Sequence, residues 1–473
     1  MSFLHYLIIA LGVVLVFNLL IGVHELGHFL AARWRGLKVE RFAIWFGKPI
    51  WKKKVGGVEY ALGWIPAGGY VSLPQMATME AIEGKTDETA EKLPNVAPLD
   101  KIIVAFAGPL FSFLLAVAFA VVVWQVGKPS NAFDNNTTIG WVDPSGPAAK
   151  AGLQAGDRIL EVDGHPVNHF TAATADSVTW RIVTSTGTNI AIRYSRDGQE
   201  ATTYAPLYHR VTKWYERKAL RQILVMGADK AIIYEIATNS PAALAGLRRG
   251  DEITALDGNK IFSWMAIEQA QQAMSNGIVS PMTLTVRRGN DQFDSTITPV
   301  KPKQPADAYP LLGIMSWQGN TNVTLIHPLP LVQIRESSAQ IFNTLGALFK
   351  KRGEIGVQQL GGAVMIIRVY SNLFQDADGW RRVLWFSVIL NVNLALLNML
   401  PLPVLDGGHI LLSLIEWVRR RPVSPKILNT IQSTFAVLLI AFMVYIAFFD
   451  AGDWFRSARA NRETPVIFAP PAK

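Results

Sequence analysis

The sequence has no cysteine and few charged residues. The absence of cysteine among 473 residues excludes a disulfide scaffold, a cysteine nucleophile and any thiolate metal site, so a bound metal must use His, Asp or Glu. Charged residues make up 17% of the chain against ~25% in an average soluble domain, and 50% of residues are hydrophobic. Neither an ordinary cytosolic protein nor a disordered chain has this composition. At roughly 100–200 residues per domain, the length predicts two to four units.

Four long apolar stretches are the strongest feature of the sequence. They span residues 6–23, 102–126, 383–405 and 431–449, each near the ~20 residues with which a helix crosses a bilayer. Buried helices of a large soluble protein are the alternative, which four such stretches in one chain disfavour. The first stretch has no basic segment before it and no small-residue cleavage site after it, so we expect it to be retained. The sequence predicts a polytopic α-helical membrane protein with four transmembrane helices.

Basic residues predict the orientation of these helices. Lys and Arg cluster from Arg33 to Lys54 and again from Arg419 to Lys426. Because cytoplasmic loops carry the excess of Lys and Arg, both clusters should be cytoplasmic, with both termini and residues 127–382 on the far side. Three arginines in the tail oppose this weakly: Arg456, Arg459 and Arg462. The net charge of +9 is thus a topology signal, and no nucleic-acid partner is expected.

The insert between the second and third stretches contains an internal repeat. Residues 145–164 recur as residues 239–258, and each copy predicts a short helix, a glycine turn, a strand and an Asp-Gly turn. The repeated positions are Gly152, Gly156, Asp157, Ile159, Asp163 and Gly164 in the first copy. The pattern resembles PDZ domains, which bind an extended peptide as an added strand. We expect two inserted PDZ-like α+β domains with a possible bound peptide; spacer domains with blocked grooves are the alternative.

A metal-binding motif continues the first apolar stretch. In His24-Glu25-x-x-His28 both imidazoles lie on one helical face and can reach one ion, while Glu25 lies one step round, toward a bound water. An unpaired ionisable group at bilayer depth costs ~2.5–3.5 kcal/mol, and a cation would compensate all three. The alternative is a helix end that has merely surfaced into water.

The third ligand must come from elsewhere, because a catalytic zinc usually has three protein ligands. The second and fourth stretches contain no His, Asp or Glu, whereas the third ends near Asp406 and His409. Pro401 and Pro403 should break the helix, so that the unwound chain could aim Asp406 at the ion. Asp406 and His409 both stay open as ligands on this reasoning, and Asp406 could instead only N-cap a helix at 407–419.

These motifs together resemble the site-2 proteases, zinc metalloproteases that cut inside membranes. The matching residues are the His-Glu-x-x-His of 24–28, the Ala-Gly-Pro of 107–109 and the Asn-to-Gly segment 398–407, and the resemblance spans residues 4–449. It implies a Zn²⁺ ion and the following roles: His24, His28 and Asp406 as ligands, Glu25 as the catalytic base, and His409 as a local or secondary residue.

The resemblance also interprets residues 41–72, where the sequence alone predicts two or three short strands. It implies a re-entrant β-hairpin that dips toward the active site, and this chain has Trp45-Phe46-Gly47 where the family often has Gly-aromatic-Gly. The substrate-binding residues it implies are Gly68, Gly69, Tyr70, Asn393 and Asn398. For the two asparagines, the alternative is that they only bind neighbouring helices.

The remaining segments complete the predicted organisation. Residues 73–99 should form a polar loop, and helical spacing within 306–382 predicts an amphipathic helix that rests on the membrane, on the core or on the PDZ-like pair. The predicted divisions are 1–32, 33–100, 101–126, 127–220 and 221–305 for the two PDZ-like domains, 306–382, 383–428, 429–449 and 450–473.

The resemblance implies hydrolysis of peptide bonds in transmembrane segments of single-pass proteins in the bacterial inner membrane, near its cytoplasmic side. Implied substrates are anti-sigma factors already cut by another protease, or signal-peptide remnants. The periplasmic PDZ-like pair would exclude proteins with a bulky periplasmic domain. Two other classes are a membrane-anchored PDZ adaptor without catalysis and an ion or solute transporter; four helices without a repeat among them disfavour the transporter.

Overall fold

The protein is described by a computed structural model of most of the chain. The described residues are 3–76, 96–131, 136–171, 174–305, 307–318, 323–350, 353–376, 378–421, 425–460 and 466–469. The polar loop predicted at 73–99 therefore lies mostly outside them. The chain divides into two compact units, one of residues 1–129, 326–342 and 360–451, and one of residues 130–325, 343–359 and 452–473.

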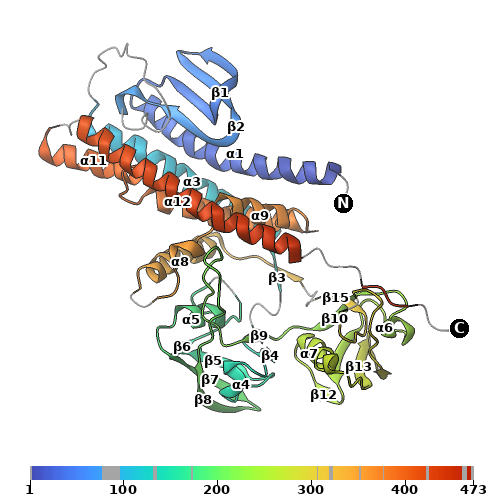
Figure 1. Ribbon diagram of the computed structural model, residues 1–473. Helices are drawn as coiled ribbons and strands as arrows, with labels where there is room; N and C mark the ends of the chain where they lie inside the picture. The colour runs from blue at the N-terminus through green and yellow to red at the C-terminus, as the bar shows by residue number, and fades with distance from the viewer. Residues whose placement is uncertain are drawn as a thin grey trace. The chain divides into compact units, whose positions relative to one another are not determined.

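The first unit contains four helices long and apolar enough to span a membrane (Figure 1). They are α1 (Phe3–Trp34), α3 (Pro98–Val126), α10 (Gly379–Asn398) and α12 (Pro425–Ala460). Their most apolar windows have mean hydropathies of 2.7, 2.5, 1.2 and 2.2. Large apolar side chains of α12, such as Val437 and Val444, are exposed, which is the surface expected of a helix in contact with lipid. The prediction of four apolar helices of spanning length is confirmed.

Helix α3 packs against α1, α10 and α11 (Asp406–Arg419). Its buried side chains are mostly small: Ala105, Ala107, Gly108, Ala116 and Ala120. Small residues let helix backbones approach closely within a membrane. At Gly27 of α1, an added Cβ would collide with the backbone of Ala107. The α1–α3 contact is therefore backbone against backbone.

The third apolar stretch is interrupted as its prolines predict. Helix α10 ends at Asn398, residues 399–405 contain Pro401 and Pro403 and are not helical, and α11 begins at Asp406. Gly407 and Gly408 permit this return, because a Cβ at either position would collide with carbonyl oxygens of residues 399–402. The start of α11 is thereby pressed against the end of α10.

A β-hairpin follows α1, formed by β1 (Arg41–Val55) and β2 (Val58–Ser72), and a short 3-10 turn, η1 (Pro74–Met76), ends it. Residues 41–44 pair with 69–72 on one side and with 59–62 on the other, and 51–54 pair with the far side of 59–62. Each long strand thus bends back, and the sheet has four short segments where the sequence alone predicted two or three. Its edges are 51–54 and 69–72.

Further helices complete the first unit and lead out of it. They are α8 (Pro330–Leu348), η3 (Val357–Gln359) and α9 (Ala363–Leu373). Helix α8 lies where the amphipathic helix was predicted: Ile334 packs on buried residues of α3 and α10, and Ala347, in the second unit, packs with Val183 of α5 (Val178–Thr184). The Asp450 carboxylate of α12 accepts hydrogen bonds from the backbone amides of Gly362 and Met365, at the start of α9.

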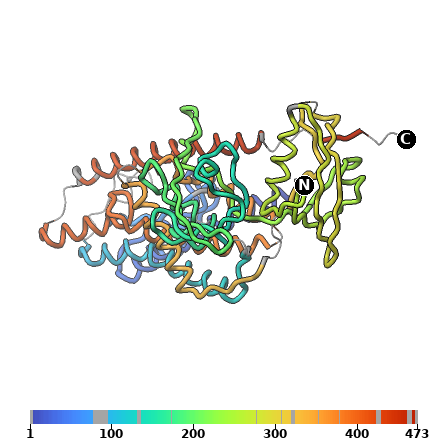
Figure 2. The backbone as a smooth tube through the Cα atoms, turned by 90° about the horizontal axis from the view of Figure 1, so that it is seen from below, coloured from blue at the N-terminus to red at the C-terminus, as the bar shows by residue number. Residues whose placement is uncertain are grey.

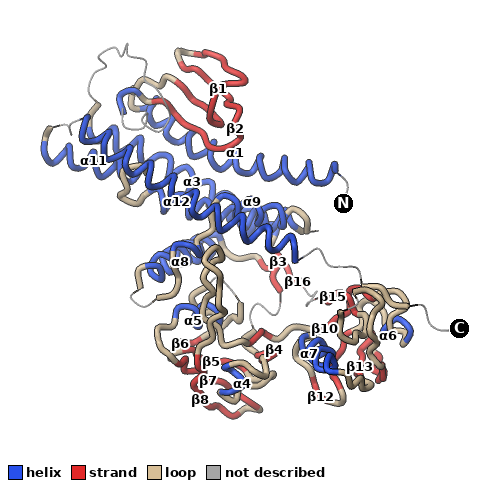
Figure 3. Tube along the Cα trace, viewed as in Figure 1, coloured by secondary structure: helices blue, strands red, loops and turns tan. Residues whose placement is uncertain are grey.

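The second unit holds two small domains of strands and short helices (Figure 3). The first domain consists of β4 (Ile139–Val142), α4 (Pro147–Lys150), β5 (Arg158–Val162), β6 (His165–Pro166), α5 (Val178–Thr184), β7 (Asn189–Arg196), β8 (Gln199–Pro206) and β9 (Val225–Gly227). Its sheets have the strand orders β6-β5-β7-β8 and β4-β9. Its core holds thirteen buried apolar residues, among them Ile159, Ile190 and Ile192.

The second domain repeats this order of elements. It consists of β10 (Ala231–Ile236), α6 (Pro241–Leu244), β11 (Glu252–Leu256), β12 (Asn259–Lys260), α7 (Met265–Ala273), η2 (Met274–Asn276), β13 (Met282–Arg288), β14 (Asp291–Ile297) and β15 (Ile314–Gln318). The sheet order is β14-β13-β11-β10-β15, with β12 on β11. Strands β3 (Lys128–Asn131) and β16 (Val323–Ile326) lie where the chain enters and leaves the second unit.

The repeated aspartates have the same contacts in both domains. The Asp157 carboxylate accepts a bidentate pair of hydrogen bonds from Arg196 and another bond from the Gln154 amide. Asp251 accepts the equivalent bonds from Arg288 and the Arg248 amide. The Asp-Gly turns also match: Asp163 and Asp257 both have a φ of 49°, and each is followed by a glycine of positive φ, as a type I′ turn requires. The predicted helix, glycine turn, strand and Asp-Gly turn are present in both copies.

Candidate metal centre

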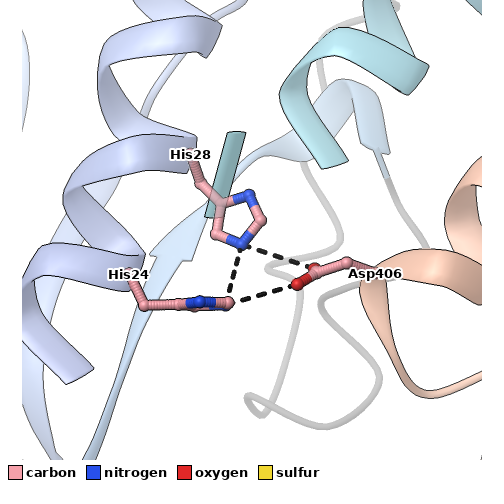
Figure 4. Close-up of side chains that lie close together, drawn as sticks. All are labelled: His24, His28 and Asp406. Atoms are coloured by element: carbon pink, nitrogen blue, oxygen red, sulfur yellow. Dashed lines mark hydrogen bonds and ion pairs between the residues drawn. The ribbon is translucent and has the colours of Figure 1, made fainter. Parts of the chain in front are cut away.

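Three buried side chains from two distant helices meet in the first unit (Figure 4). His24 and His28 lie one turn apart on α1, which stays helical through the motif, and Asp406 is the first residue of α11. Their relative exposures are 7%, 1% and 7%. Asp406 does not cap its own helix, since the N-cap residue is Leu405 and makes no side-chain cap bond. The carboxylate is directed at the two imidazoles instead.

Two imidazole nitrogens and the two oxygens of one carboxylate form a compact group. The Nε2 atoms of His24 and His28 are 3.3 Å apart, His24 Nε2 is 3.3 Å from Oδ2 of Asp406, and His28 Nε2 is 3.3 Å from Oδ1. Zinc binds nitrogen and carboxylate oxygen at ~2.0–2.2 Å in a tetrahedron, whose edge is ~1.6 bond lengths, or roughly 3.3–3.5 Å. Each of these separations matches the spacing of two ligands on one zinc ion. The three side chains can therefore hold a single ion and would leave its fourth position open.

Helix α3 fixes the orientation of both imidazoles. The Nδ1 atom of His28 is 2.8 Å from the Val104 carbonyl oxygen, which only accepts, so this nitrogen carries the proton and Nε2 keeps its lone pair for a metal. The Nδ1 atom of His24 is 2.9 Å from the hydroxyl oxygen of Ser112, which is fully buried. Metal-binding histidines usually donate their second N–H in this way, which fixes the tautomer.

Gly108 provides the room for His28. An added Cβ at this position would collide with the His28 ring, closest at Nε2, the nitrogen that faces the metal site. The Ala107-Gly108-Pro109 motif therefore lies against the site, between the two residues that orient the imidazoles, Val104 and Ser112.

Two of the other predicted site residues, Asn398 and Gly69, lie near this centre, and two more, Gly68 and Tyr70, contact Phe46 of the hairpin. The Asn398 amide nitrogen is 3.4 Å from His24 Nε2, and the position of a Cβ on Gly69 is 3.3 Å from the Glu25 side chain. Gly68 lies under the Phe46 ring, and Phe46 stacks on Tyr70 with ring centroids 6.1 Å apart.

Asn393 and His409 do not join the ligand group. The side-chain oxygen of Asn393 is buried and has no hydrogen-bond partner among the described residues. His409 is buried one turn beyond Asp406 on α11, but the described residues that could hold a metal together are His24, His28 and Asp406. Of the two candidates that residue type and spacing left open, the structure thus brings Asp406 to the histidines.

Ser112 and Val104 are the residues that sequence reasoning missed. An isolated serine in the uncharged stretch 102–126 was a usable signal, because a polar side chain at membrane depth needs a partner. Nothing in the sequence could single out the backbone carbonyl of Val104, since every residue has a carbonyl group. Only the packing of α3 on α1 selects it.

A two-histidine, one-carboxylate metal site within apolar helices defines the class of protein: a membrane metallopeptidase of the zinc-dependent kind. The model of Peptidase family M50 matches residues 12–442, so the chain belongs to this family of site-2 metalloendopeptidases. The resemblance stated from the motifs is thereby confirmed.

Named relatives align over nearly their full lengths. A Haemophilus influenzae protein named regulator of sigma E protease is 28% identical, over 92% of this chain and 97% of the relative. The regulator of sigma-E protease RseP of Salmonella typhimurium is 27% identical, over 94% and 97%. A Vibrio cholerae protein whose name assigns it as a zinc metalloprotease is 29% identical, over 89% and 92%.

Proposed function

We propose that this enzyme hydrolyses peptide bonds in transmembrane segments of single-pass proteins in the bacterial inner membrane. The observation that carries the proposal is the buried group of His24, His28 and Asp406, with both histidines on a helix of membrane-spanning composition. A soluble metallopeptidase has no need to build its metal site from such helices. The specific substrates we propose are anti-sigma factors already cut by another protease, and signal-peptide remnants.

His24, His28 and Asp406 hold the zinc ion in this proposal. When bound, zinc supplies a Lewis acid that lowers the pKa of water and polarises the scissile carbonyl. The Glu25 carboxylate accepts the proton of the attacking water and delivers it to the nitrogen of the leaving amine. Ser112 and the Val104 carbonyl keep the two imidazoles in the tautomer that leaves Nε2 free for the metal.

The hairpin edge at residues 69–72 captures the substrate. A transmembrane helix hides its carbonyls in internal hydrogen bonds, so it must unwind before a peptidase can reach them. Segment 69–72 pairs with 41–44 on one side, and among the described strands none pairs with its other side. An unwound substrate can add there as a strand. Gly69 lies beside Glu25, so a strand on this edge passes the catalytic base.

Asn393 and Asn398 hold backbone groups that the unwinding frees. The unpartnered oxygen of Asn393 is an acceptor available for a substrate N–H. Asn398 is close enough to His24 to act at the scissile bond. Normal cleavage by an Asn393→Ala, Asn398→Ala double variant would remove this clamp from the proposal.

The two domains of the second unit act as a PDZ-like, periplasmic size gate, which excludes substrates that retain a bulky periplasmic domain. Support comes from their shared order of elements and their repeated Asp–Arg contacts. The basic clusters after α1 and α11 support an orientation with both termini periplasmic and the metal site nearer the cytoplasmic side. Deletion of 128–305 should abolish discrimination between trimmed and full-length substrate.

The decisive experiment co-expresses a tagged single-pass substrate, trimmed on its periplasmic side, with wild type or Glu25→Gln. Loss of cleavage in the variant, with zinc content unchanged, supports the proposed base. Equal cleavage by both would place the chemistry elsewhere and favour the second candidate, a non-catalytic PDZ adaptor. That candidate is otherwise disfavoured, since an adaptor has no use for a buried group of metal ligands spaced as on one zinc ion.

A further inference from the structure

The chain returns to the second domain after its last membrane helix. Residues 466–469 lie beside this domain, as the red segment near α6 in Figure 1 and the red segment beside the yellow-green domain in Figure 2 show. The backbone of Ile467 pairs with that of Gln304: the Ile467 amide donates to the Gln304 carbonyl at 3.0 Å, and the Lys303 amide donates to the Ile467 carbonyl at 2.7 Å. The two residues form an antiparallel bridge.

A buried aromatic ring reinforces this backbone pairing. Phe468 is only 4% exposed, although it lies five residues from the end of the chain. Its ring reaches Gly313, which precedes β15 and has a φ of 84°. The position of a Cβ on Gly313 is 3.0 Å from the Phe468 ring, and it also collides with the side chain of Ser240. Gly313 has no side chain, so it leaves room for the buried Phe468 ring.

The same end of the chain also contacts the first domain. Asp453, in the last turns of α12, accepts hydrogen bonds from Arg217 and from Arg456. Arg217 belongs to the segment between β8 and β9 and also donates to the Gln358 carbonyl. Residues 453 and 467–468 therefore hold one domain each, fourteen residues apart.

We propose that residues 466–469, the C-terminal strap, tie the second domain to the end of α12 through the buried side chain of Phe468, while Asp453 of α12 contacts the first domain. Six peptide steps separate Ala460 from Val466, and an extended chain covers at most ~3.6 Å per residue. While the strap is docked, its site on the second domain stays within roughly 20 Å of the end of α12. The docked strap also requires the second domain and the C-terminus to be on one side of the membrane.

The strap has a consequence for selection, which rests on the proposed gate. A gate made of two domains opens by moving one of them, and a docked strap, as a second point of attachment, restricts that motion. Release of Phe468 should therefore admit full-length substrate that the docked state excludes. A strap locked in place should strengthen the exclusion without changing the metal site, because its described residues Ile467 and Phe468 contact the second domain.

The absence of native cysteine makes docking directly measurable. Gln304 and Ile467 are exposed and directly opposite in an antiparallel bridge, where Cα atoms are ~5.5 Å apart, within the ~4.4–6.8 Å range of a disulfide. In purified full-length protein, a Gln304→Cys, Ile467→Cys pair should oxidise to an intramolecular disulfide. Neither cysteine should then react with maleimide. A control pair, Asp291→Cys with Ile467→Cys, uses β14 at the opposite edge of the sheet and should stay reduced.

Phe468→Ala in the first pair should slow the oxidation at least about tenfold. Phe455→Ala is the matched control, since Phe455 is an aromatic residue on α12 that is 72% exposed. Unchanged oxidation in Phe468→Ala, or equal oxidation of the control pair, would overturn the docking.

The functional arm compares the oxidised and reduced forms of the same cysteine pair. We expect the oxidised form to cut full-length substrate less than the reduced form, Phe468→Ala to cut it more than wild type, and all to cut trimmed substrate equally. If the ratio of full-length to trimmed substrate cleaved is the same in the oxidised, reduced and Phe468→Ala forms, the role of the strap in selection is overturned. Failure of wild type to cut trimmed substrate would instead refute the proposed function, and the disulfide result would still decide whether the strap docks.

Discussion

Replacement of Ser112 by alanine tests how α3 supports the metal site. The Ser112 hydroxyl lies 2.9 Å from the His24 Nδ1 atom, and Ser112 is fully buried, so water cannot replace the hydroxyl easily. An unsatisfied buried donor costs ~1–3 kcal/mol. Removal of the group that accepts the second N–H of a metal-binding histidine typically lowers metal affinity ~10–100-fold. Because tenfold equals ~1.4 kcal/mol, the two ranges agree.

We therefore expect Ser112→Ala to weaken zinc binding about 10–100-fold. Zinc affinity is measured by competition with a chelator of known affinity, and cleavage of the trimmed substrate is measured at limiting and at saturating zinc. Since Glu25 and the three ligands are untouched, saturating zinc should restore most of the activity.

Ser387→Ala is the matched control. Ser387 is also a buried serine of a candidate membrane helix, and its hydroxyl is hydrogen-bonded to the Tyr370 hydroxyl at 2.8 Å. This hydrogen bond involves no metal ligand. Its zinc affinity should equal that of wild type. Wild-type affinity in Ser112→Ala, or an equal loss in both variants, would refute the reasoning that Ser112 orients His24.

Three further predictions concern other contacts. Gly108→Ala should abolish zinc binding because its Cβ collides with the His28 ring, whereas Gly22→Ala on α1, which meets open space, should not; zinc content of the purified variants decides. Asp251→Asn should destabilise the second domain by on the order of 2 kcal/mol, with hydrogen exchange of residues 231–297 faster than in Asp157→Asn. Burial raises the pKa of Asp251, but the bonds from Arg288 and the Arg248 amide outweigh it and hold the pKa below its usual range. The folded domain thus binds fewer protons than the unfolded chain, and this stabilisation, complete above pH ~4, should fade as the pH falls further, which exchange measured at pH 3 and 5 would show.

Sequence by itself determined the features that depend on short spacing. Apolar runs of spanning length predicted α1, α3, α10 and α12, because only helices satisfy their own backbone within lipid. The i, i+4 spacing placed His24 and His28 on one face, and the prolines at 401 and 403 ended α10. The repeat predicted both Asp-Gly turns, since the turn type is decided by two adjacent residues.

Tertiary structure alone decided the contacts between distant segments. Asp406 and His409 were equal candidates by spacing, and the glycine-permitted return at 407–408 selects Asp406. The Val104 carbonyl and Ser112 become partners of the histidines only because α3 packs backbone to backbone on α1. The folding back of β1 and β2 and the docking of Phe468 likewise follow from long-range packing, which no local periodicity encodes. Local spacing thus supplied the ligands, and packing assembled them into a site.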